Sequence, residues 1–473
     1  MGGAESKKKE AEILQLFSVE ERQNIHKLFQ HISPNQSITE PFLKKHIEKF
    51  INLDLDVFHA VCHCGINKGQ IQDKHVTEVQ FAGFLAQCLK GTYSEKADVF
   101  CLLSGRDDGF VPVRKLYQTV NNVIKSYLHI SKSDTPCKTW KYQVSSEDVS
   151  RLSISFLAQN KFCDIDRGVE ENSQNEIDVG GGYKSQDEVE DWLSKCHMFL
   201  KMFDRVFYHL FPVISKDSAH NIIQSFMPAA SNVDWNKTTT ILETLSISYI
   251  NYHLPREHQS IWRLLYSNSL HGDSFAQLTR YVLGKGPNVL LVKDKDGHVF
   301  GAYVSDSWEI KPTFYGSSEC FLFSIKPNYG VYTTTGYNSN YIYFNQGQET
   351  MPNGLGLGGQ LDYFGLWIDY TFNNGHSKAV PKCTTYGSPQ LSKNADFSVD
   401  SIEIWAVGPE RKKHDSDDEE SRVSILDKDS GAKALLELAG KKQHSEGIRD
   451  LEEDEAPLTE EMKKKMNVIP KMM

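Results

Sequence analysis

The stretch NGLGLGGQLDYFGLWID, residues 353–369, decides the fold of the carboxy-terminal half of this chain. Gly354, Gly356 and Gly359 have the G-x-G-x-x-G spacing of a dinucleotide-binding turn, which needs a strand before the first glycine and a helix after the third. Residues 364–370 instead alternate between the two faces of a strand, and the preceding strand ends too early. Because no helix N-terminus follows to hold a pyrophosphate, we expect the glycines to serve tight turns and close backbone packing in an all-β core.

Strand-like segments surround this stretch from about residue 287 onward. The apolar period changes there from about 3.6 to 2, and β-branched and aromatic residues alternate with turn signals. The segments are NVLLVKD (288–294), GHVFGAYVS (297–305), ECFLFSI (319–325), VYTTTG (331–336), YIYFNQ (341–346), YFGLWIDYTF (363–372) and SVDSIEIWAVG (398–408). Asp296-Gly297 is typical of a hairpin turn because strands flank it. Several antiparallel strands within about 120 residues predict a β-sandwich.

The amino-terminal half carries apolar residues at helical spacing instead. Residues 11–130 are therefore expected to form a helical domain. The loop SGRDDGFVPVRK (104–115) resembles an EF-hand calcium loop, with Gly109 at the sixth position, where the sharp turn needs it. Lys115 stands at the twelfth position, where calcium takes a bidentate glutamate. A fainter loop, 31–42, lacks the glycine, so we predict an EF-hand-like scaffold that holds no metal.

A second helical region is expected over residues 131–240. Ser145 or Ser146 is available as the N-cap of a helix that ends near residue 163. Residues 164–187 are rich in Asp, Asn and Gly and are interpreted as a mobile loop. The pattern from Val189 to Leu210 makes one broad apolar face, which predicts core, and residues 238–252 and 257–268 continue the helical pattern.

Composition limits the classes of protein to which the chain can belong. It has 473 residues, 39% of them hydrophobic, and a formal net charge of -10, which is ordinary for a globular chain of several domains. The acidic balance argues against a nucleic-acid partner, since phosphate neutralisation needs clustered basic residues. Nine scattered cysteines, an odd number, indicate reduced cytosolic thiols and not a disulfide framework.

The first residues suggest attachment to a membrane surface. Met-Gly-Gly-Ala-Glu-Ser fits the N-myristoylation pattern M-G-x-x-x-[ST], with Gly2 as the acceptor. One myristoyl chain binds membranes only marginally, so Lys7, Lys8 and Lys9 in the basic segment 1–10 would add to it. No apolar run is long enough for a transmembrane helix. An ordinary amino terminus without acylation is the alternative interpretation.

The strand region is identified as a member of the TLDc domain family. The resemblance covers residues 243–409 and rests on LLYSNSLHGDSFAQL (264–278), HVFGAYVSDSW (298–308), FYGSSECFLFSIKP (314–327), YNSNYIYFN (337–345), NGLGLGGQLDYFGLWID (353–369) and FSVDSIEIWAVG (397–408). It implies a two-sheet antiparallel β-sandwich flanked by helices, with no established catalytic centre and no cofactor. The fold class is then α+β, a helical EF-hand-like half followed by this sandwich and a C-terminal helix.

The resemblance also implies partners and a location. TLDc proteins bind the vacuolar proton-pumping ATPase and are associated with resistance to oxidative stress. The EF-hand-like front and the Gly2 motif resemble a subgroup tied to mTOR signalling. We therefore expect a cytoplasmic protein, peripheral on the cytosolic face of lysosomal membranes, whose partners are the vacuolar ATPase and mTOR signalling components.

No set of residues predicts a catalytic centre. Cys320 follows Glu319 at the head of an apolar strand, where a buried structural thiol is favoured over a nucleophile. His271, Asp273 and Ser274 include the residue types of a serine triad, but helix capping by Asp273 or Ser274 explains them more simply. Cys62-His63-Cys64 lacks a second ligand pair for zinc, and His376 is expected to be a solvated loop residue.

Residues 410–473 are expected to form an acidic linker, a short amphipathic helix over 431–440 and a disordered tail. Ser416 lies in an acidic context that suits phosphorylation. Leu435, Leu436 and Leu438 on that helix are the candidate partner contact; docking onto the chain's own domain is the alternative.

The sequence favours a non-enzymatic adaptor over two alternatives. The first alternative is a redox or hydrolytic enzyme centred on Cys320 and Glu319. The second is a calcium-responsive binding module that would depend on Asp107 and Asp108.

Overall fold

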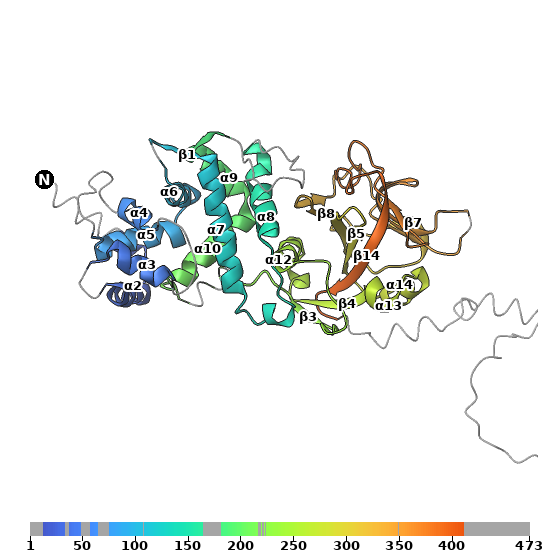
Figure 1. Cartoon of the computed structure of the whole chain (residues 1–473), viewed down its shortest axis with the longest axis horizontal. Helices are drawn as coiled ribbons and strands as arrows, with labels where there is room; N and C mark the ends of the chain where they lie inside the picture. Colours follow the sequence, from blue (N-terminus) through green and yellow to red (C-terminus); the bar gives the residue numbers. More distant parts are fainter. Residues whose placement is uncertain are drawn as a thin grey trace, which may run out of the picture. The chain divides into compact units, whose positions relative to one another are not determined.

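The computed structural model of the chain describes residues 13–33, 37–48, 57–64, 75–106, 108–163, 181–215, 219, 222, 224–348 and 350–410. A helical half precedes an antiparallel β half, so the predicted α+β class is confirmed (Figure 1). The predicted C-terminal helix, 431–440, lies outside the described residues. Of the helices in the described part, none is both long and apolar enough for a membrane span.

The first four described helices form two paired helix–loop–helix units. They are α2 (Val19–Ile32), α3 (Glu40–Glu48), α4 (Val57–His63) and α5 (Glu78–Lys90). Their loops meet at an antiparallel bridge, where Ile38 N–H donates to the Val76 carbonyl at 2.9 Å and Val76 N–H donates back at 2.8 Å. Helices joined by paired loops are the arrangement of an EF-hand pair, as the sequence predicts.

A second pair follows and has a longer inter-loop strand pairing. Its elements are α6 (Tyr93–Leu103), β1 (Phe110–Pro112), α7 (Val113–Ser131), α8 (Ser146–Ala158), β2 (Tyr183–Ser185) and α9 (Gln186–Lys195). Strands β1 and β2 are antiparallel, with Val111 opposite Lys184. The predicted loop 164–187 therefore ends earlier than expected, since its last residues pair with the third loop and start a helix.

Side-chain caps decide where these helices begin. Ser18, Thr77, Thr92 and Ser185 each form a capping box, in which the hydroxyl and the third helical residue satisfy each other's backbone N–H. Ser145 caps α8 through its side chain, which confirms one of the two predicted caps. Each cap contributes about 1 kcal/mol, so the loop ends are set locally.

Helix α10 (His197–Leu210) fills the groove of the first EF-hand-like pair. The ring of Phe211, just after the helix, meets Phe81 and Phe84 edge-on at centroid distances of 5.6 and 6.0 Å. His46 Nε2 lies 3.0 Å from the Leu210 carbonyl oxygen. The apolar face predicted as core is confirmed, and the groove in which an EF-hand pair can bind an amphipathic helix is occupied in cis.

Residues 257–268 do not continue the helical pattern, and that prediction is wrong. A single 3-10 turn, η3 (Arg256–His258), leads into strand β4 (Ile261–Ser267). Its buried residues, Trp262, Leu264 and Tyr266, follow the period of a strand. The segment IWRLLYS is apolar enough for either period, and pairing with a distant strand decides the outcome. The predicted helix 238–252 is likewise shorter, because α12 spans Thr244–His253.

The carboxy-terminal half forms the predicted sandwich of two sheets. One sheet has the order β3-β4-β14-β5-β6-β8-β9 and the other β7-β10-β11-β12-β13-β14, so the long strand β14 belongs to both. All pairs are antiparallel except β3 with β4. The elements are β3 (Ala229–Ser231), β5 (Asn288–Asp294), β6 (Val299–Val304), β7 (Lys311–Tyr315), β8 (Phe321–Lys326), β9 (Gly330–Thr333), β10 (Ile342–Asn345), β11 (Gly354–Gln360), β12 (Tyr363–Asp369), β13 (Asn374–His376) and β14 (Asp396–Val407), with short helices α13 (Asn268–His271) and α14 (Phe275–Val282).

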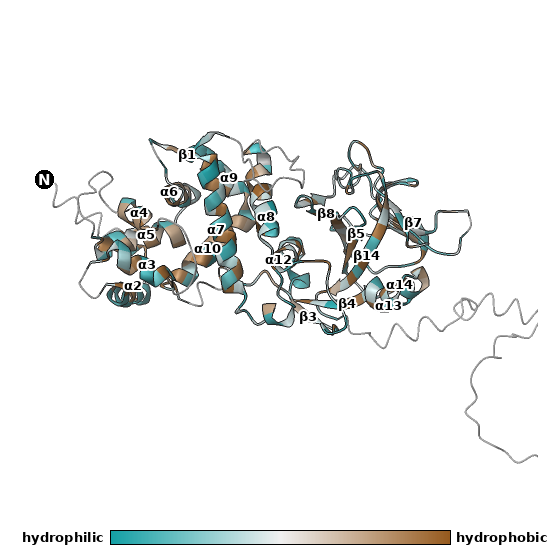
Figure 2. Cartoon of the chain, in the orientation of Figure 1, coloured by the Kyte–Doolittle hydropathy of each residue, from teal (hydrophilic) through white to brown (hydrophobic). Residues whose placement is uncertain are grey.

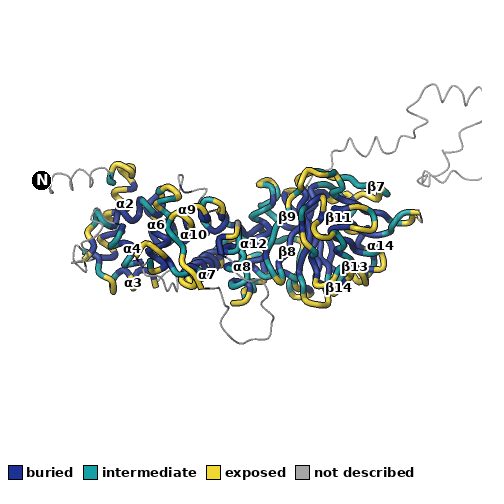
Figure 3. The backbone as a smooth tube through the Cα atoms, turned by 90° about the horizontal axis from the view of Figure 1, so that it is seen from above, coloured by how far each residue is buried: buried dark blue, intermediate teal, exposed yellow. Residues whose placement is uncertain are grey.

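Two apolar clusters explain this layering. The first fills the space between the sheets, with Leu290 and Phe300 from one and Phe344 and Leu366 from the other. The second runs through the helical half and continues onto the outer face of the first sheet, which contributes residues such as Trp405. Figure 2 shows hydrophobic residues along α10, β5 and β14, and Figure 3 shows buried backbone among the strands of the sandwich around β8 and β11. The helical half and the sandwich therefore share one continuous core.

Candidate functional site

The residues predicted for lipidation and partner binding lie outside the described part of the chain. They are Gly2 with Lys7, Lys8 and Lys9 at one end, and Leu435, Leu436 and Leu438 at the other. Those predictions stay predictions. Asp107 of the possible calcium loop and Ser416 also lie outside the described residues, and the remaining candidates fall on described ones.

The glycines of the G-x-G-x-x-G stretch lie inside strand β11, between β10 and β12. The expected close packing is correct, because a Cβ on Gly356 would lie 2.5 Å from the Phe364 ring. The prediction that these glycines form tight turns is wrong, because they lie within a strand. Gly359 has a φ of +79° within the strand, and a Cβ there would lie 2.2 Å from the Tyr363 carbonyl oxygen. A helix does not follow, so the stretch offers no dinucleotide site.

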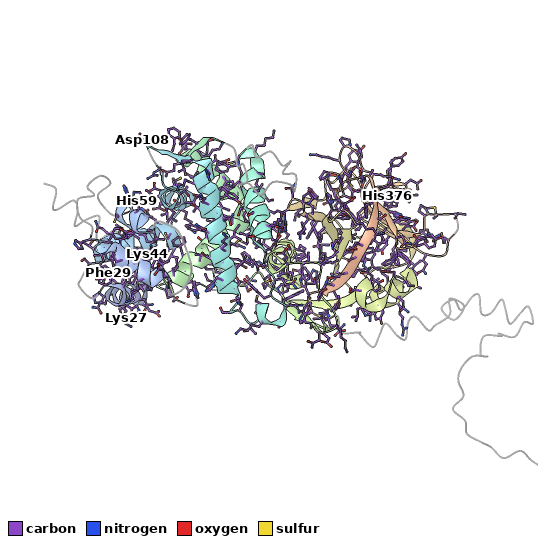
Figure 4. All side chains as sticks on the ribbon, in the orientation of Figure 1. Lys27, Phe29, Lys44, His59, Asp108 and His376 are labelled. Atoms are coloured by element: carbon purple, nitrogen blue, oxygen red, sulfur yellow. The ribbon has the colours of Figure 1, made fainter. Side chains whose placement is uncertain are left out.

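The third EF-hand-like loop holds a side-chain cation of its own. Arg106, at the third loop position, places Nη1 2.5 Å from Asp98 Oδ1 and 3.0 Å from Gln186 Oε1. Ser104, at the first position, donates from Oγ to the Phe100 carbonyl oxygen at 2.8 Å, away from any ion. Figure 4 labels Asp108 at the tip of this loop. The guanidinium thus supplies positive charge to a loop that would otherwise need a metal.

The inter-loop pairings place all four loops in one register. Ile38, Val76, Val111 and Lys184 take the eighth position, and the following helix begins two residues later in each case. The twelfth positions are then Phe42, Gln80, Lys115 and Glu188. Glu188 is the one glutamate, and it is engaged in the capping box with Ser185 and an ion pair to Lys184 at 3.0 Å. No described group of three or more His, Cys, Asp or Glu side chains could hold a metal.

A buried polar cluster fastens the helical half to the sandwich. Tyr329, between β8 and β9, donates from its hydroxyl to Asp148 Oδ1 on α8 at 2.7 Å. The Ser246 hydroxyl on α12 lies 2.8 Å from the Tyr329 hydroxyl, and Arg151 Nη2 donates to Asp148 Oδ1 at 2.9 Å. Burial raises the pKa of Asp148, while Tyr329 opposes that rise. Because the cluster is buried and hydrogen-bonded, removing one member leaves buried polar groups without partners, which is costly.

Four tryptophans form a second contact between the helical half and the sandwich. Trp140 lies 5.0 Å from Trp405, 5.6 Å from Trp235 and 6.0 Å from Trp262 between ring centroids. Every indole N–H has an acceptor; Trp140 Nε1, for example, donates to the Pro228 carbonyl oxygen at 2.8 Å. Large rings with satisfied N–H groups make a stiff contact, so the two halves are held together from both sides.

A cavity of about 270 Å³ opens on the sandwich beside the contact that the tryptophans form. Its lining is mostly hydroxyl, amide and lysine side chains, namely Thr239, Thr240, Ile241, Ser267, Asn268, Ser269, Lys293, Gly297, Val299, Lys326, Ser401 and Glu403. Lys293 pairs with Asp400 at 3.2 Å and Lys326 with Glu243 at 3.6 Å, which holds the two amines at the rim. Glu403 is the buried carboxyl of this cavity.

The Glu403 carboxylate accepts three hydrogen bonds and forms no ion pair with a described residue. Thr240 Oγ1 donates at 2.8 Å, Trp405 Nε1 at 2.9 Å and the Ile241 N–H at 2.8 Å. Burial raises the pKa of Glu403 to about 7, and the donors offset only part of that rise. The carboxyl can exchange a proton near neutral pH, but no base–nucleophile pair accompanies it in this cavity.

The sequence reasoning missed Glu403, although a signal was present. A glutamate stands within the apolar run SIEIWAVG, on the strand face opposite Ile402 and Ile404. A charged side chain on a buried strand predicts either hydrogen-bond or ion-pair partners or a perturbed pKa. The partners, however, come from residues 240 and 241, and only the fold brings those beside it.

Cys320 has the surroundings of a structural thiol. Its side chain is 1% exposed, and burial raises its pKa above the ordinary thiol value. Ser305 N–H and Oγ lie 3.4 and 3.3 Å from its sulfur. Nucleophilic cysteines need a lowered pKa and access, so this geometry does not favour a reaction at Cys320. The neighbouring Glu319 is exposed.

The possible triad residues have separate partners. His271 Nδ1 accepts from the Ser267 N–H at 3.1 Å, and Asp273 Oδ1 accepts from Asn268 Nδ2 at 2.9 Å. Ser274 is the N-cap residue of α14, as predicted, although its hydroxyl makes no capping bond. The segment shapes the α13–α14 turn.

The prediction for His376 as a solvated loop residue is wrong. It lies on β13 with its ring stacked 5.9 Å from Trp367, among the strands of the sandwich (Figure 4). Burial, with a smaller effect of Lys378, lowers the pKa of His376 to about 4. Cys62 and His63, the other candidate ligands, end helix α4, where the rings of His63 and His59 pack at 4.2 Å.

Comparison with known proteins agrees with this architecture. The TLDc domain model matches residues 235–408. MTOR-associated protein MEAK7 of Gallus gallus is 39% identical over 396 residues, 82% of this chain and 82% of the relative. The Homo sapiens protein of that name is 34% identical over 459 residues, 93% of this chain and 97% of the relative. The chain belongs to the MEAK7 family of TLDc-domain proteins.

Another relative matches a smaller share of the chain. Oxidation resistance protein 1 of Xenopus laevis is 36% identical over 195 residues, which is 41% of this chain and 22% of that protein. The MEAK7 likeness extends across the EF-hand-like half, so that half belongs to what this family shares. The cavity around Glu403 lies within the residues that match the TLDc domain.

Proposed function

We propose that this member of the MEAK7 family is a non-enzymatic regulatory adaptor that supports mTOR signalling. It attaches to the cytosolic face of lysosomal membranes and binds the vacuolar proton-pumping ATPase. The observation that carries the proposal is the likeness, over 82% and 97% of their lengths, to relatives named MTOR-associated protein. The pump is proposed as the partner because the TLDc resemblance implies it.

The contacts between the two halves support an adaptor. Tyr329 and Asp148 join the sandwich to α8 through buried hydrogen bonds, and Trp140 packs against Trp405 at a second contact. A body held this way offers a partner a preformed surface and loses little conformational entropy on binding. The cysteine and histidine candidates for catalysis are instead engaged in packing and in structural hydrogen bonds.

Attachment through Gly2 can be tested apart from pump binding. Cells that express the wild-type chain, Gly2→Ala or the matched control Gly3→Ala receive an alkyne-labelled myristate. We expect label on the wild type and the control, and none on Gly2→Ala. The membrane fraction of Gly2→Ala should fall as well, since the lysines alone bind membranes weakly. Equal labelling of all three chains would exclude Gly2 as the acceptor.

The partner test is affinity capture from lysosomal membranes. The wild type, Gly2→Ala and a chain truncated after Gly408 are compared for recovery of pump subunits. We expect the wild type to recover the pump, and Gly2→Ala to recover it from solubilised membranes, where a tether is not needed. Failure of the wild type to bind any pump subcomplex would overturn the proposal.

The contribution of residues 431–440 needs its own variant. Aspartate at Leu435, Leu436 and Leu438 together should lower pump recovery if this apolar face docks on the partner. Leu451→Asp with Leu458→Asp places the same kind of change elsewhere in the tail as a control. Equal recovery of the pump by both variants would show that these leucines are not part of the interface, and the sandwich would then be the candidate binding surface.

A further inference from the structure

A second cavity, of about 260 Å³, lies where helix α10 approaches the start of the sandwich. Three parts of the chain line it: α10, the segment before β3, and α12 with η3. The residues are Lys201, Gln224, Ser225, Phe226, Tyr252, Arg256 and Gln259. It is distinct from the Glu403 cavity, since the two share no lining residue.

Among the described residues, neither cation of this cavity forms an ion pair with an acid. None of the described residues that line it is acidic. Asp204, one turn from Lys201 on α10, is paired with Lys96 at 2.6 Å. Asp134 is the partner of Arg205 at 2.6 Å. Within the described part of the chain, these two acids near Lys201 are therefore engaged with other cations, and Lys201 and Arg256 place two positive charges at the opening.

The rest of the lining supplies donors on a fixed support. Arg205 Nη1 donates to the Gln224 carbonyl oxygen at 3.0 Å, which holds the backbone beside the cavity. Ser225 Oγ accepts from the Met227 N–H at 3.2 Å, so its own hydrogen is available to a ligand. Lys201 Nζ lies 5.1 Å above the Tyr252 ring, and that ring meets Phe226 at 5.1 Å. The amine is thus held over an aromatic floor.

We propose that this cavity binds the phosphate group of a phosphomonoester through Lys201, Arg256 and Ser225. A guanidinium and an ammonium together suit a doubly charged tetrahedral anion, to which a hydroxyl can add a third hydrogen bond. The volume is slightly below the ~300 Å³ at which pockets for drug-sized ligands begin. A compact head group such as a phosphorylated polyol fits that space. The source is either a soluble phosphate ester or a lipid head group.

The position of the cavity gives the ligand a structural effect. Lys201 belongs to the helical half, whereas Arg256 lies within the residues that match the TLDc domain. A phosphate held by both would connect the halves at a third place, beside the Tyr329 cluster and the tryptophans. A ligand that binds only the folded chain raises its melting temperature, so binding has a readout that needs no knowledge of the partner.

The experiment uses the full, unacylated chain and measures binding by calorimetry and melting temperature. The soluble probes are inorganic phosphate, inositol trisphosphate, and chloride at matched ionic strength. The variants are Lys201→Gln and Arg256→Gln, with Lys285→Gln as the matched control, because Lys285 is also exposed and is not part of the cavity. Loss of one charge-assisted contact should weaken binding about tenfold or more.

A second arm separates the two sources. Vesicles of phosphatidylcholine, with or without a phosphoinositide, are sedimented with each variant. Recruitment that depends on the phosphoinositide and is lost in both cavity variants, but not in Lys285→Gln, assigns a lipid head group. Soluble binding that is lost in the cavity variants, with no such recruitment, assigns a soluble ester. The proposal is overturned if the wild type binds neither inorganic phosphate nor inositol trisphosphate saturably and the phosphoinositide does not recruit it, or if all three variants bind like the wild type.

Discussion

Arg106 Nη1 lies 2.5 Å from Asp98 Oδ1, so a side-chain cation joins the third EF-hand-like loop to helix α6. The same nitrogen donates to Gln186 Oε1 at the start of α9, which extends the link to the fourth loop. In an EF-hand, a bound calcium ion performs this ordering by neutralising the loop carboxylates. Here the chain carries the positive charge covalently.

Arg106→Gln should destabilise the helical half. The change removes the charge-assisted hydrogen bond from Arg106 to the nearly buried Asp98 carboxylate, and such a bond contributes about 1.5–3 kcal/mol. Chemical denaturation of the two chains measures the difference in free energy of unfolding. Lys115→Gln is the control, because this exposed lysine lies on the same loop and changes charge equally. Equal stability of both variants would show that the ion pair contributes little.

Calcium should leave the melting temperature of the wild-type chain unchanged. Arginine occupies the third position and lysine the twelfth of the third loop, and the glutamate of the fourth loop is engaged in a capping box. Differential scanning calorimetry with calcium or a chelator checks this, and magnesium controls for a general effect of divalent ions. A rise specific to calcium would revive the calcium-responsive alternative.

Tyr329→Phe should weaken the connection between the halves. The substitution keeps the ring but removes the hydroxyl that donates to Asp148 and contacts Ser246. Loss of a buried hydrogen bond to a carboxylate costs about 1.5–3 kcal/mol. Tyr337→Phe is the control, since that side chain is 81% exposed. Limited proteolysis between the halves should quicken in Tyr329→Phe alone; unchanged cleavage and stability would contradict the role of the cluster.

Glu403→Gln should flatten the dependence of stability on pH. The folded pKa of Glu403 is raised from 4.5 to about 7, so the folded chain holds the extra proton between those values. The contribution of Glu403 to the free energy of unfolding is then fully present below about pH 4.5 and is lost as the pH rises through about 7. At about 1.4 kcal/mol per pKa unit, the fall is at most about 3.5 kcal/mol.

Denaturation at pH 5 and pH 8 compares the wild type with Glu403→Gln. The loss of stability between the two pH values should be smaller in the variant, whose amide cannot ionise. Glu319→Gln, at an exposed carboxylate, should behave like the wild type. Parallel pH profiles for wild type and Glu403→Gln would mean that the carboxyl titrates outside this window.

Thiol labelling should find one accessible cysteine in the folded chain. Eight of the nine cysteines are buried, Cys320 among them, and Cys62 is partly exposed. Native-state labelling followed by mass spectrometry should modify Cys62 first, and Cys62→Ser should lose that signal. All nine should react after denaturation. Rapid native labelling of Cys320 would restore the enzyme alternative.

Local sequence signals predict much of this fold because their causes are local. The N-cap at Ser145 and the Asp296-Gly297 turn depend on residues a few positions apart. The candidate site was harder to predict. The Glu403 cavity needs residues 239–241, 267–269, 293 and 326, and the phosphate cavity needs α10 and η3 together. The spacing of residues along the sequence does not show which distant segments will line the same cavity.

The sequence by itself determined the α+β division, the EF-hand-like loops with a lysine at the twelfth position, and the sandwich strands. Those features follow from apolar period, caps and turn residues, which act over one or two turns of chain. Tertiary structure alone decided that Ile261–Ser267 is a strand, because β14 supplies its hydrogen-bond partners. It also decided the pKa of Glu403 and the cation link at Arg106, since burial and long-range charge exist only once distant segments have packed.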